Sequence, residues 1–179
     1  VVIILVNYLL KPVSDVFLIA DGVLFAGIIL FIQLKINEAN KKAFFLNCTA
    51  ALFAGFYLNT VFYNEIVPYK GQIAAAEYVN QKPFDNFHIY TVNAGNNIFQ
   101  FYCKGQVGLV PVEQFNRFKP DKSSVFYLDQ QSMDYLTKNH AGFKVIRSFI
   151  NYPKENLVLA FINKDTRYKT LDHVCLVSK

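Results

Sequence analysis

The sequence predicts transmembrane α-helices followed by an extracytoplasmic α/β domain built on a mixed sheet. Three observations predict this fold class. Hydrophobic residues make up 53% of the chain and charged residues only 17%, whereas a soluble globular protein carries about a quarter charged residues. The shortage of charge lies before about residue 63, where two apolar runs have the length of a membrane span. After that point, helical and strand patterns alternate.

Residues 1–64 are predicted to be transmembrane, with a partial span at 1–11 and full spans at 13–35 and 43–62. The apolar runs inside the full spans are each about twenty residues long, which at 1.5 Å per residue crosses about 30 Å of hydrocarbon. Val1 to Leu10 is apolar but too short, and it lacks an initiator Met and the basic start of a signal peptide. We therefore expect it to be the tail of another spanning helix in a truncated chain.

A core hairpin of a soluble protein is the alternative for these two helices. Such a helix normally shows a polar stripe with a period of 3.6 residues. Leu24 to Ile32 (LFAGIILFI) has none and is apolar all round. This pattern favours lipid as the surrounding solvent.

The distribution of lysines predicts the orientation. The connector Lys35 to Lys42 (KINEANKK) holds three lysines and one Glu, whereas Lys11 to Asp15 holds one Lys and one Asp. The positive-inside rule places the lysine-rich connector in the cytoplasm. Residues after about 63 then lie on the periplasmic side of a bacterial inner membrane.

Residues 65–179 are predicted to form the periplasmic domain. In chain order we expect a helix from Pro68 to before Pro83, a strand at Phe87–Val92, a helix at Asn97–Cys103, a strand at Val107–Val110, a short helix at Val112–Phe118, a strand at Ser124–Leu128, a helix at Gln131–Asn139, paired strands at Phe143–Phe149 and Leu157–Ile162, and a last strand at Val174–Val177. This alternation favours a three-layer, Rossmann-like sheet, parallel in its first part and antiparallel at its end.

A candidate ligand loop follows the first predicted strand. Asn93, Asn96 and Asn97 lie in the segment TVNAGNN, at the carboxyl end of that strand, where open α/β sheets bind ligands. The segment has one glycine and lacks the GxGxxG pattern of dinucleotide sites. An ordinary turn explains the same composition.

Asp21 is the candidate intramembrane polar residue. A carboxylate within a spanning segment costs several kcal/mol, about 3 on insertion scales, unless it is paired, hydrated or protonated. Such a residue is a functional candidate by default. It is expected about two turns from the outer boundary, where helix capping, snorkelling or pairing with another helix is an equally good reading.

The remaining polar residues indicate no catalytic or metal site. His88, His140 and His173 have no metal-ligand spacing with Cys, Asp or Glu, and Cys103 and Cys175 could either bridge or remain two buried thiols. No Ser/His/Asp arrangement or close carboxylate pair marks a hydrolase. Lysines are scattered along the domain without a stripe, which a solvated surface explains. The alternative is a weak attraction to membrane lipid, through anionic headgroups or lipid-phosphate substrates, and the compartment excludes nucleic acid.

The end of the chain carries a resemblance. In Phe161 to Val177 (FINKDTRYKTLDHVCLV), the residues Asn163, Asp165, Thr166 and Arg167 resemble the FLNPxTR-like turn between the last two strands of GT-C-type bacterial glycosyltransferases, with Lys164 where that family often has proline. These are the enzymes of glycosyltransferase family 39, similar to aminoarabinose transferase and protein O-mannosyltransferases. The resemblance covers about Val13 to Lys179.

The resemblance implies transfer of a sugar from a polyprenyl-phosphate carrier to a lipid, protein or glycan acceptor. In that family the catalytic acidic residue lies in an early outer loop that this chain lacks, so the catalytic residues are unknown and the fragment alone is expected to be inactive. No cofactor is expected here, although the full-length enzyme could use a divalent metal. The alternative is a non-enzymatic, membrane-anchored periplasmic binding or scaffold domain.

Overall fold

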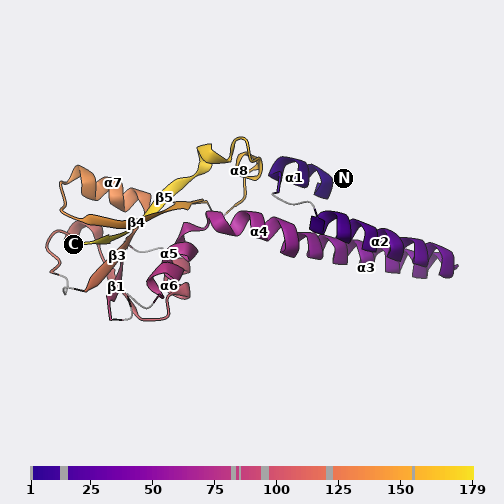
Figure 1. Ribbon diagram of the computed structural model, residues 1–179, viewed down its shortest axis with the longest axis horizontal. Coiled ribbons are helices and arrows are strands. Elements are labelled where there is room, and N and C mark those ends of the chain that lie inside the picture. The colour runs from indigo at the N-terminus through magenta and orange to yellow at the C-terminus, as the bar shows by residue number, and fades with distance from the viewer. Residues whose placement is uncertain are drawn as a thin grey trace. The chain divides into compact units, whose positions relative to one another are not determined.

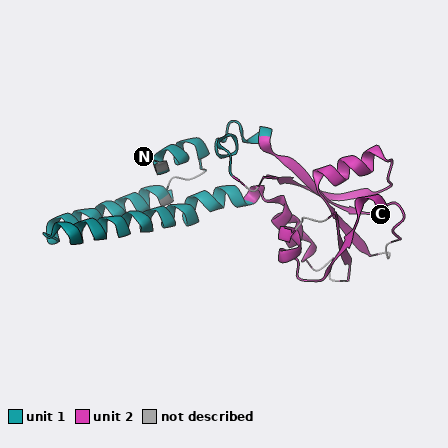
Figure 2. Cartoon of the chain, turned by 180° about the vertical axis from the view of Figure 1, so that it is seen from behind, with its two compact units in different colours: residues 1–67, 157–169 teal, residues 68–156, 170–179 magenta. Residues whose placement is uncertain are grey.

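The computed structural model describes residues 2–12, 16–81, 84, 86–93, 97–119, 123–154 and 156–179. The chain forms two compact units (Figure 2). The first, here called the helical unit, comprises Val1–Val67 and Leu157–Lys169; the second, the sheet unit, comprises Pro68–Asn156 and Thr170–Lys179. The helical unit therefore includes a segment from late in the chain, a grouping that the sequence did not indicate.

The helical unit is dominated by a pair of long helices. Its elements are α1 (Val2–Leu10), α2 (Val16–Lys35), α3 (Ala39–Tyr57), the π-helical turn η1 (Leu58–Phe62), α4 (Tyr63–Ile66) and, at the unit boundary, the 3₁₀ turn η2 (Val67–Tyr69). Figure 1 shows α2 and α3 side by side as a hairpin. The ring of Phe25 lies 4.9 Å from that of Phe53 and 6.5 Å from that of Phe56, measured between ring centroids. Aromatic packing thus holds the two helices together.

Both helices of the hairpin present apolar side chains on their outer surface. Among the described side chains of α2, only Asp21, Phe25 and Ile32 are buried, whereas Leu30 is 60% exposed. Leu18–Lys35 and Ala39–Tyr69 are long and apolar enough to cross a membrane, judged by length and composition. The helices therefore do not form the buried core of this chain.

Polar side chains of the second long helix bond to the backbone of their own helix. Thr49, Asn59 and Thr60 each donate to the carbonyl oxygen four residues earlier, at 2.7–2.8 Å. A hydrogen bond of this kind satisfies the polar group without water. These polar residues are consequently compatible with an apolar environment.

The sheet unit contains a mixed five-stranded sheet. Its strands are β1 (His88–Val92), β2 (Val107–Val110), β3 (Ser124–Leu128), β4 (Lys144–Asn151) and β5 (Asp172–Ser178), in the order β2-β1-β3-β5-β4. β1 pairs in parallel with β2 and β3, and β5 pairs antiparallel with β3 and β4. The predicted parallel first part and antiparallel end are confirmed.

Two hydrophobic clusters join helices to this sheet. The helical elements are α5 (Gly71–Val79), α6 (Asn97–Tyr102), η4 (Val112–Gln114) and α7 (Gln130–Lys138). One cluster unites α5 and α6 with Val125 and Tyr127 of β3. The other unites η4 and α7 with Phe126 and Leu128. Successive residues of β3 enter different clusters because side chains alternate along a strand, and both clusters explain why this strand is fully buried.

Two predicted elements differ from the structure. The predicted strand at Leu157–Ile162 is instead the short helix α8 (Leu159–Ile162), and β4 pairs with β5. A short apolar run such as LVLAFI does not distinguish strand from helix by periodicity, and Arg167 satisfies the carbonyl groups at the helix end. The predicted helix at Val112–Phe118 is limited to the 3₁₀ turn η4. Another 3₁₀ turn, η5 (Arg167–Thr170), precedes β5.

Candidate functional site

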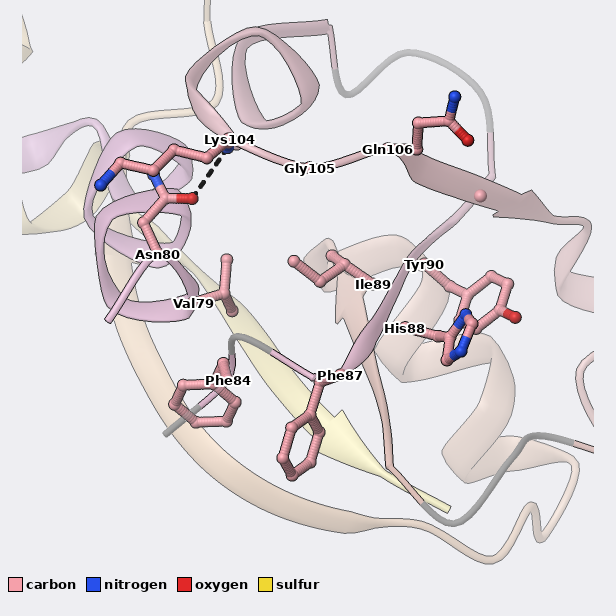
Figure 3. Close-up of a pocket in the computed structure, with 11 residues that line it drawn as sticks. Val79, Asn80, Phe84, Phe87, His88, Ile89, Tyr90, Lys104, Gly105 and Gln106 are labelled. Carbon is pink, nitrogen blue, oxygen red and sulfur yellow. Dashed lines mark hydrogen bonds between the residues drawn. The ribbon is translucent and has the colours of Figure 1, made fainter. Parts of the chain in front are cut away.

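A cavity of about 450 Å³ opens in the sheet unit where β1 and the segment before β2 diverge. Its walls are the end of α5, the segment before β1, and the backbone of residues 104–106 (Figure 3). Asn80 holds two of these walls together. Its side chain donates to the carbonyl oxygen of Tyr102 at 2.8 Å and accepts from the backbone N–H of Lys104 at 2.9 Å.

The side chains around this cavity form an apolar floor rather than a reactive centre. Figure 3 shows Val79, Phe84, Phe87 and Ile89 gathered on one side of the hollow, while the side chain of Lys104 runs away from it. His88 and Tyr90 share the opposite face of β1 from Ile89, because side chains alternate along a strand. The described polar side chains do not converge, so the geometry supports binding by this cavity better than acid–base chemistry.

The carboxyl edge of the parallel strands carries a second polar region. Asn93 adopts a left-handed backbone conformation with φ of 68°. Its side chain accepts from the N–H of Val112 at 3.3 Å and donates to Ser132 Oγ at 3.3 Å. Asn97 begins α6 with its side chain exposed, and Asn96 lies outside the described residues. Both ends of the Asn93 amide are thus used to tie β1 to η4 and α7.

Two buried polar atoms of the same region have no hydrogen-bond partner among the residues that the structure describes. These atoms are the hydroxyl of Tyr127 and Oδ1 of Asn151. Burial, followed by the charges of Asp129 and Asp172, raises the pKa of Tyr127 far above its usual value. Gln72 opposes this rise as a donor, but its contact with the hydroxyl does not reach the geometry of a full hydrogen bond. The phenol therefore stays protonated.

The carboxylates of Asp129 and Asp172 in this region each accept a structural hydrogen bond. Asp129 caps α7 by accepting from the N–H of Ser132 at 2.8 Å, and Asp172 accepts from Nδ2 of Asn151 at 3.1 Å. Burial raises the pKa of Asp172, and the charge of Asp129 adds to this rise while the bond from Asn151 opposes it. Sequence reasoning missed this group because its members come from separate strands. Asp129 could have been identified from the sequence, because it is a carboxylate that directly follows the apolar strand SVFYL.

Asp21 is buried within the helical unit, with 9% of its surface exposed. Its Oδ2 lies 3.5 Å from Oγ1 of Thr60, whose own stronger bond goes to the carbonyl oxygen of Phe56 at 2.7 Å. Thr60 belongs to the π-helical turn η1, and π-helical turns often occur at functional positions. The predicted intramembrane polar residue thus faces a neighbouring helix across a polar contact.

Each residue of the turn Asn163–Arg167 singled out from the sequence has a structural contact. Asn163 Oδ1 accepts from the N–H of Asp165 at 3.0 Å, and Asp165 forms an ion pair with Lys11. Thr166 Oγ1 donates to the carbonyl oxygen of Ala160 at 2.8 Å, and buried Arg167 donates to that of Phe161 at 2.8 Å. The turn is therefore built into the helical unit, where it follows a helix instead of the strand typical of the resemblance.

The cysteines and metal-binding residue types form no reactive centre in the described part of the chain. Cys103 and Cys175 are free thiols. Cys175 belongs to the hydrophobic cluster that contains η4 and α7, whereas Cys103 packs against the cluster that contains α5 and α6. Burial raises the pKa of Cys103 to about 11, which lowers its reactivity at neutral pH. Among the described residues, no group of three or more His, Cys, Asp or Glu side chains could hold a metal ion.

Comparison of the chain with protein-family models, curated proteins and solved structures gives no match.

Proposed function

We propose that this chain is part of a bacterial inner-membrane glycosyltransferase of the GT-C type. In this proposal the helical unit crosses the membrane and the residues after about 63 lie in the periplasm. The enzyme transfers a sugar from a polyprenyl-phosphate carrier to a lipid, protein or glycan acceptor. The sheet unit is its three-layer, Rossmann-like outer domain.

The single observation that carries the membrane assignment is the outer surface of the α2–α3 hairpin. Large apolar side chains such as Leu24, Leu30 and Phe31 are more than half exposed there, and each costs about 1.5–3 kcal/mol when kept in water instead of being buried. Lipid removes this cost. The hydroxyl and amide groups of α3 and η1 that bond to their own helix backbone support the same solvent.

The glycosyl-transfer part is supported by the resemblance at Asn163–Arg167. Asp21 is not assigned as the catalytic base, because the family places its acidic residue in an early outer loop. Residues that act on the sugar, and any divalent metal of the complete enzyme, are expected outside this chain. The chain alone is consequently expected to show no sugar transfer.

A photoreactive polyprenyl-phosphate sugar tests this function. The chain is reconstituted in lipid nanodiscs, irradiated with the probe, and the labelled peptides are identified by mass spectrometry. Labelling of the helical unit that unlabelled polyprenyl phosphate competes away is the expected result. Labelling no stronger than that from a photoreactive phospholipid of the same chain length would contradict the assignment.

The cavity of Figure 3 favours a second candidate, a membrane-anchored domain that binds a component of the cell envelope. Gly105 lines this cavity and has open space where a side chain would project. A Gly105→Trp variant should fill the cavity and abolish binding of envelope glycan fragments, measured by calorimetry. Gly142→Trp is the matched control, because Gly142 also faces open space but does not line the cavity.

A further inference from the structure

We propose that Leu157–Lys169 is an interfacial anchor that binds an anionic lipid surface at the outer face of the membrane. The role of this segment rests on the membrane assignment proposed above. It adds which part of the chain contacts lipid headgroups and what charge those headgroups carry. The partner is a phospholipid surface and not a second protein.

The position of the segment within the helical unit is the first observation. The N–H of Lys164 donates to the carbonyl oxygen of Leu9 at 2.9 Å, and Nζ of Lys164 donates to that of Lys11 at 3.2 Å. Asp165 forms its ion pair with Lys11. Leu157–Lys169 follows most of the sheet unit in sequence, and it contacts the C-terminal end of α1, which leads into α2. The charge pattern assigns this same end to the outer face of the membrane.

The internal bonds of the segment give it a defined shape. Arg167 is only 2% exposed, and its guanidinium donates to the carbonyl oxygens of Phe161 at 2.8 Å and Ile162 at 3.2 Å. Thr166 closes the same turn through the carbonyl oxygen of Ala160. Because Arg167 is already buried and bonded to two carbonyl oxygens, contact with an interface adds little to the desolvation of its guanidinium.

The outer side chains of the segment are of the types found at membrane interfaces. Leu159 is 66% exposed, Tyr168 67% and Leu157 41%. Tyrosine is enriched where hydrocarbon meets headgroups. Leucine side chains on a short helix can enter the same boundary. Exposed apolar side chains thus occur both on this segment and on the long helices of the same unit.

The charge of this region selects an anionic surface. Leu157–Lys169 and the described residues directly after α1 carry Lys11, Lys164 and Lys169 against one described carboxylate, Asp165, which already pairs with Lys11. The ammonium of Lys169 also lies over the ring of Tyr168, 5.7 Å from its centroid. Lysine stems can lie along apolar surface while their ammonium groups reach phosphate. Each lysine near an anionic bilayer strengthens binding by about fivefold.

Site-directed fluorescence on the full chain in nanodiscs tests this role. An environment-sensitive label is placed at Leu159→Cys or Tyr168→Cys after replacement of the native cysteines by alanine. Matched labels are placed at Thr137→Cys, which is exposed on α7, and at Leu24→Cys, which is exposed on α2. Each label is quenched in turn by aqueous iodide, by spin-labelled headgroups and by spin labels deep in the acyl chains.

We expect the labels at 159 and 168 to be shielded from iodide and quenched by spin-labelled headgroups. The label at 137 should be open to iodide, and that at 24 should be quenched by the deep spin label. In nanodiscs containing phosphatidylglycerol, Lys164→Gln combined with Lys169→Gln should lower the docking equilibrium constant on the order of twenty-fold. The same variant should have little effect in phosphatidylcholine alone.

Three results would overturn the anchor. The segment would lie in water if iodide quenched the labels at 159 and 168 as strongly as the label at 137, while the label at 24 stayed shielded. Labels shielded from both iodide and spin-labelled lipid would show that protein covers it. Docking that is independent of lipid charge would show that the segment does not select an anionic lipid surface. If the label at 24 were also open to iodide, the membrane assignment itself would fail.

Discussion

At the scale of single residues, Gly71 shows how closely α5 approaches the sheet. A Cβ atom at this position would lie 2.6 Å from the carbonyl oxygen of Ile150 and 3.1 Å from Cβ of Asn151. Because the nearest atom belongs to the backbone, Gly71→Ala must displace the helix or the strand. We expect a loss of about 1–3 kcal/mol in the unfolding free energy of the sheet unit.

Thermal unfolding of the full chain in detergent, followed by the near-ultraviolet circular dichroism of its tyrosines, measures this loss. Gly142→Ala is the control, since nothing lies within 4 Å of a Cβ atom there. Equal stability of the two variants would mean that α5 does not pack against the end of β4 as described.

The raised pKa of Asp172 gives a second test at this scale. Burial favours its protonated form in the folded state, so the stability linked to this group is present below the unfolded pKa and is lost as pH rises through the folded pKa. Asp172→Asn keeps an acceptor for Nδ2 of Asn151 but carries no charge. The stability of the variant relative to the parent should therefore rise between pH 3 and pH 7.

Urea denaturation at both ends of this pH range measures the difference. A stability difference that stays constant with pH, or that falls toward pH 7, would show that Asp172 is not desolvated in the fold. Asp134→Asn serves as the control, because Asp134 is exposed on α7.

Among the helices and strands, α5 ends at its C-cap residue Asn80, which holds the wall of the cavity through its two hydrogen bonds. Asn80→Ala removes both, and we expect a loss of about 1–2 kcal/mol in the stability of the sheet unit. Asn139→Ala is the matched change, since Asn139 is exposed and bonds only to the carbonyl oxygen of Tyr135 among the contacts described. Equal unfolding midpoints for these variants would contradict the role of Asn80.

Sequence patterns predicted those elements whose periodicity is unambiguous. The strand at Ser124–Leu128 has the predicted bounds, and α7 differs from its prediction by one residue at each end. The segment 157–162 was predicted wrongly, because its helical form depends on Arg167 reaching back to close its end. The group formed by Tyr127, Asn151 and Asp172 could not be predicted either. It depends on the order of strands in the sheet, and this order places β5 between β3 and β4.

Across the molecule, the proposed topology requires that hydrocarbon surround the α2–α3 hairpin. Cys48 is a natural reporter of this environment, because it is exposed on the surface of α3. Maleimides react with the thiolate, which needs water to form. In contrast, Cys175 is buried and Cys103 has a pKa of about 11.

The most direct test measures modification of Cys48 by a membrane-impermeant maleimide in intact lipid nanodiscs. Thr137→Cys on α7 serves as the water-exposed reference, and Cys48→Ser identifies the signal. We predict that Cys48 stays unmodified while the cysteine at 137 reacts, and that Cys48 reacts once detergent has denatured the chain. Modification of Cys48 in nanodiscs at a rate similar to that at position 137 would contradict the membrane assignment.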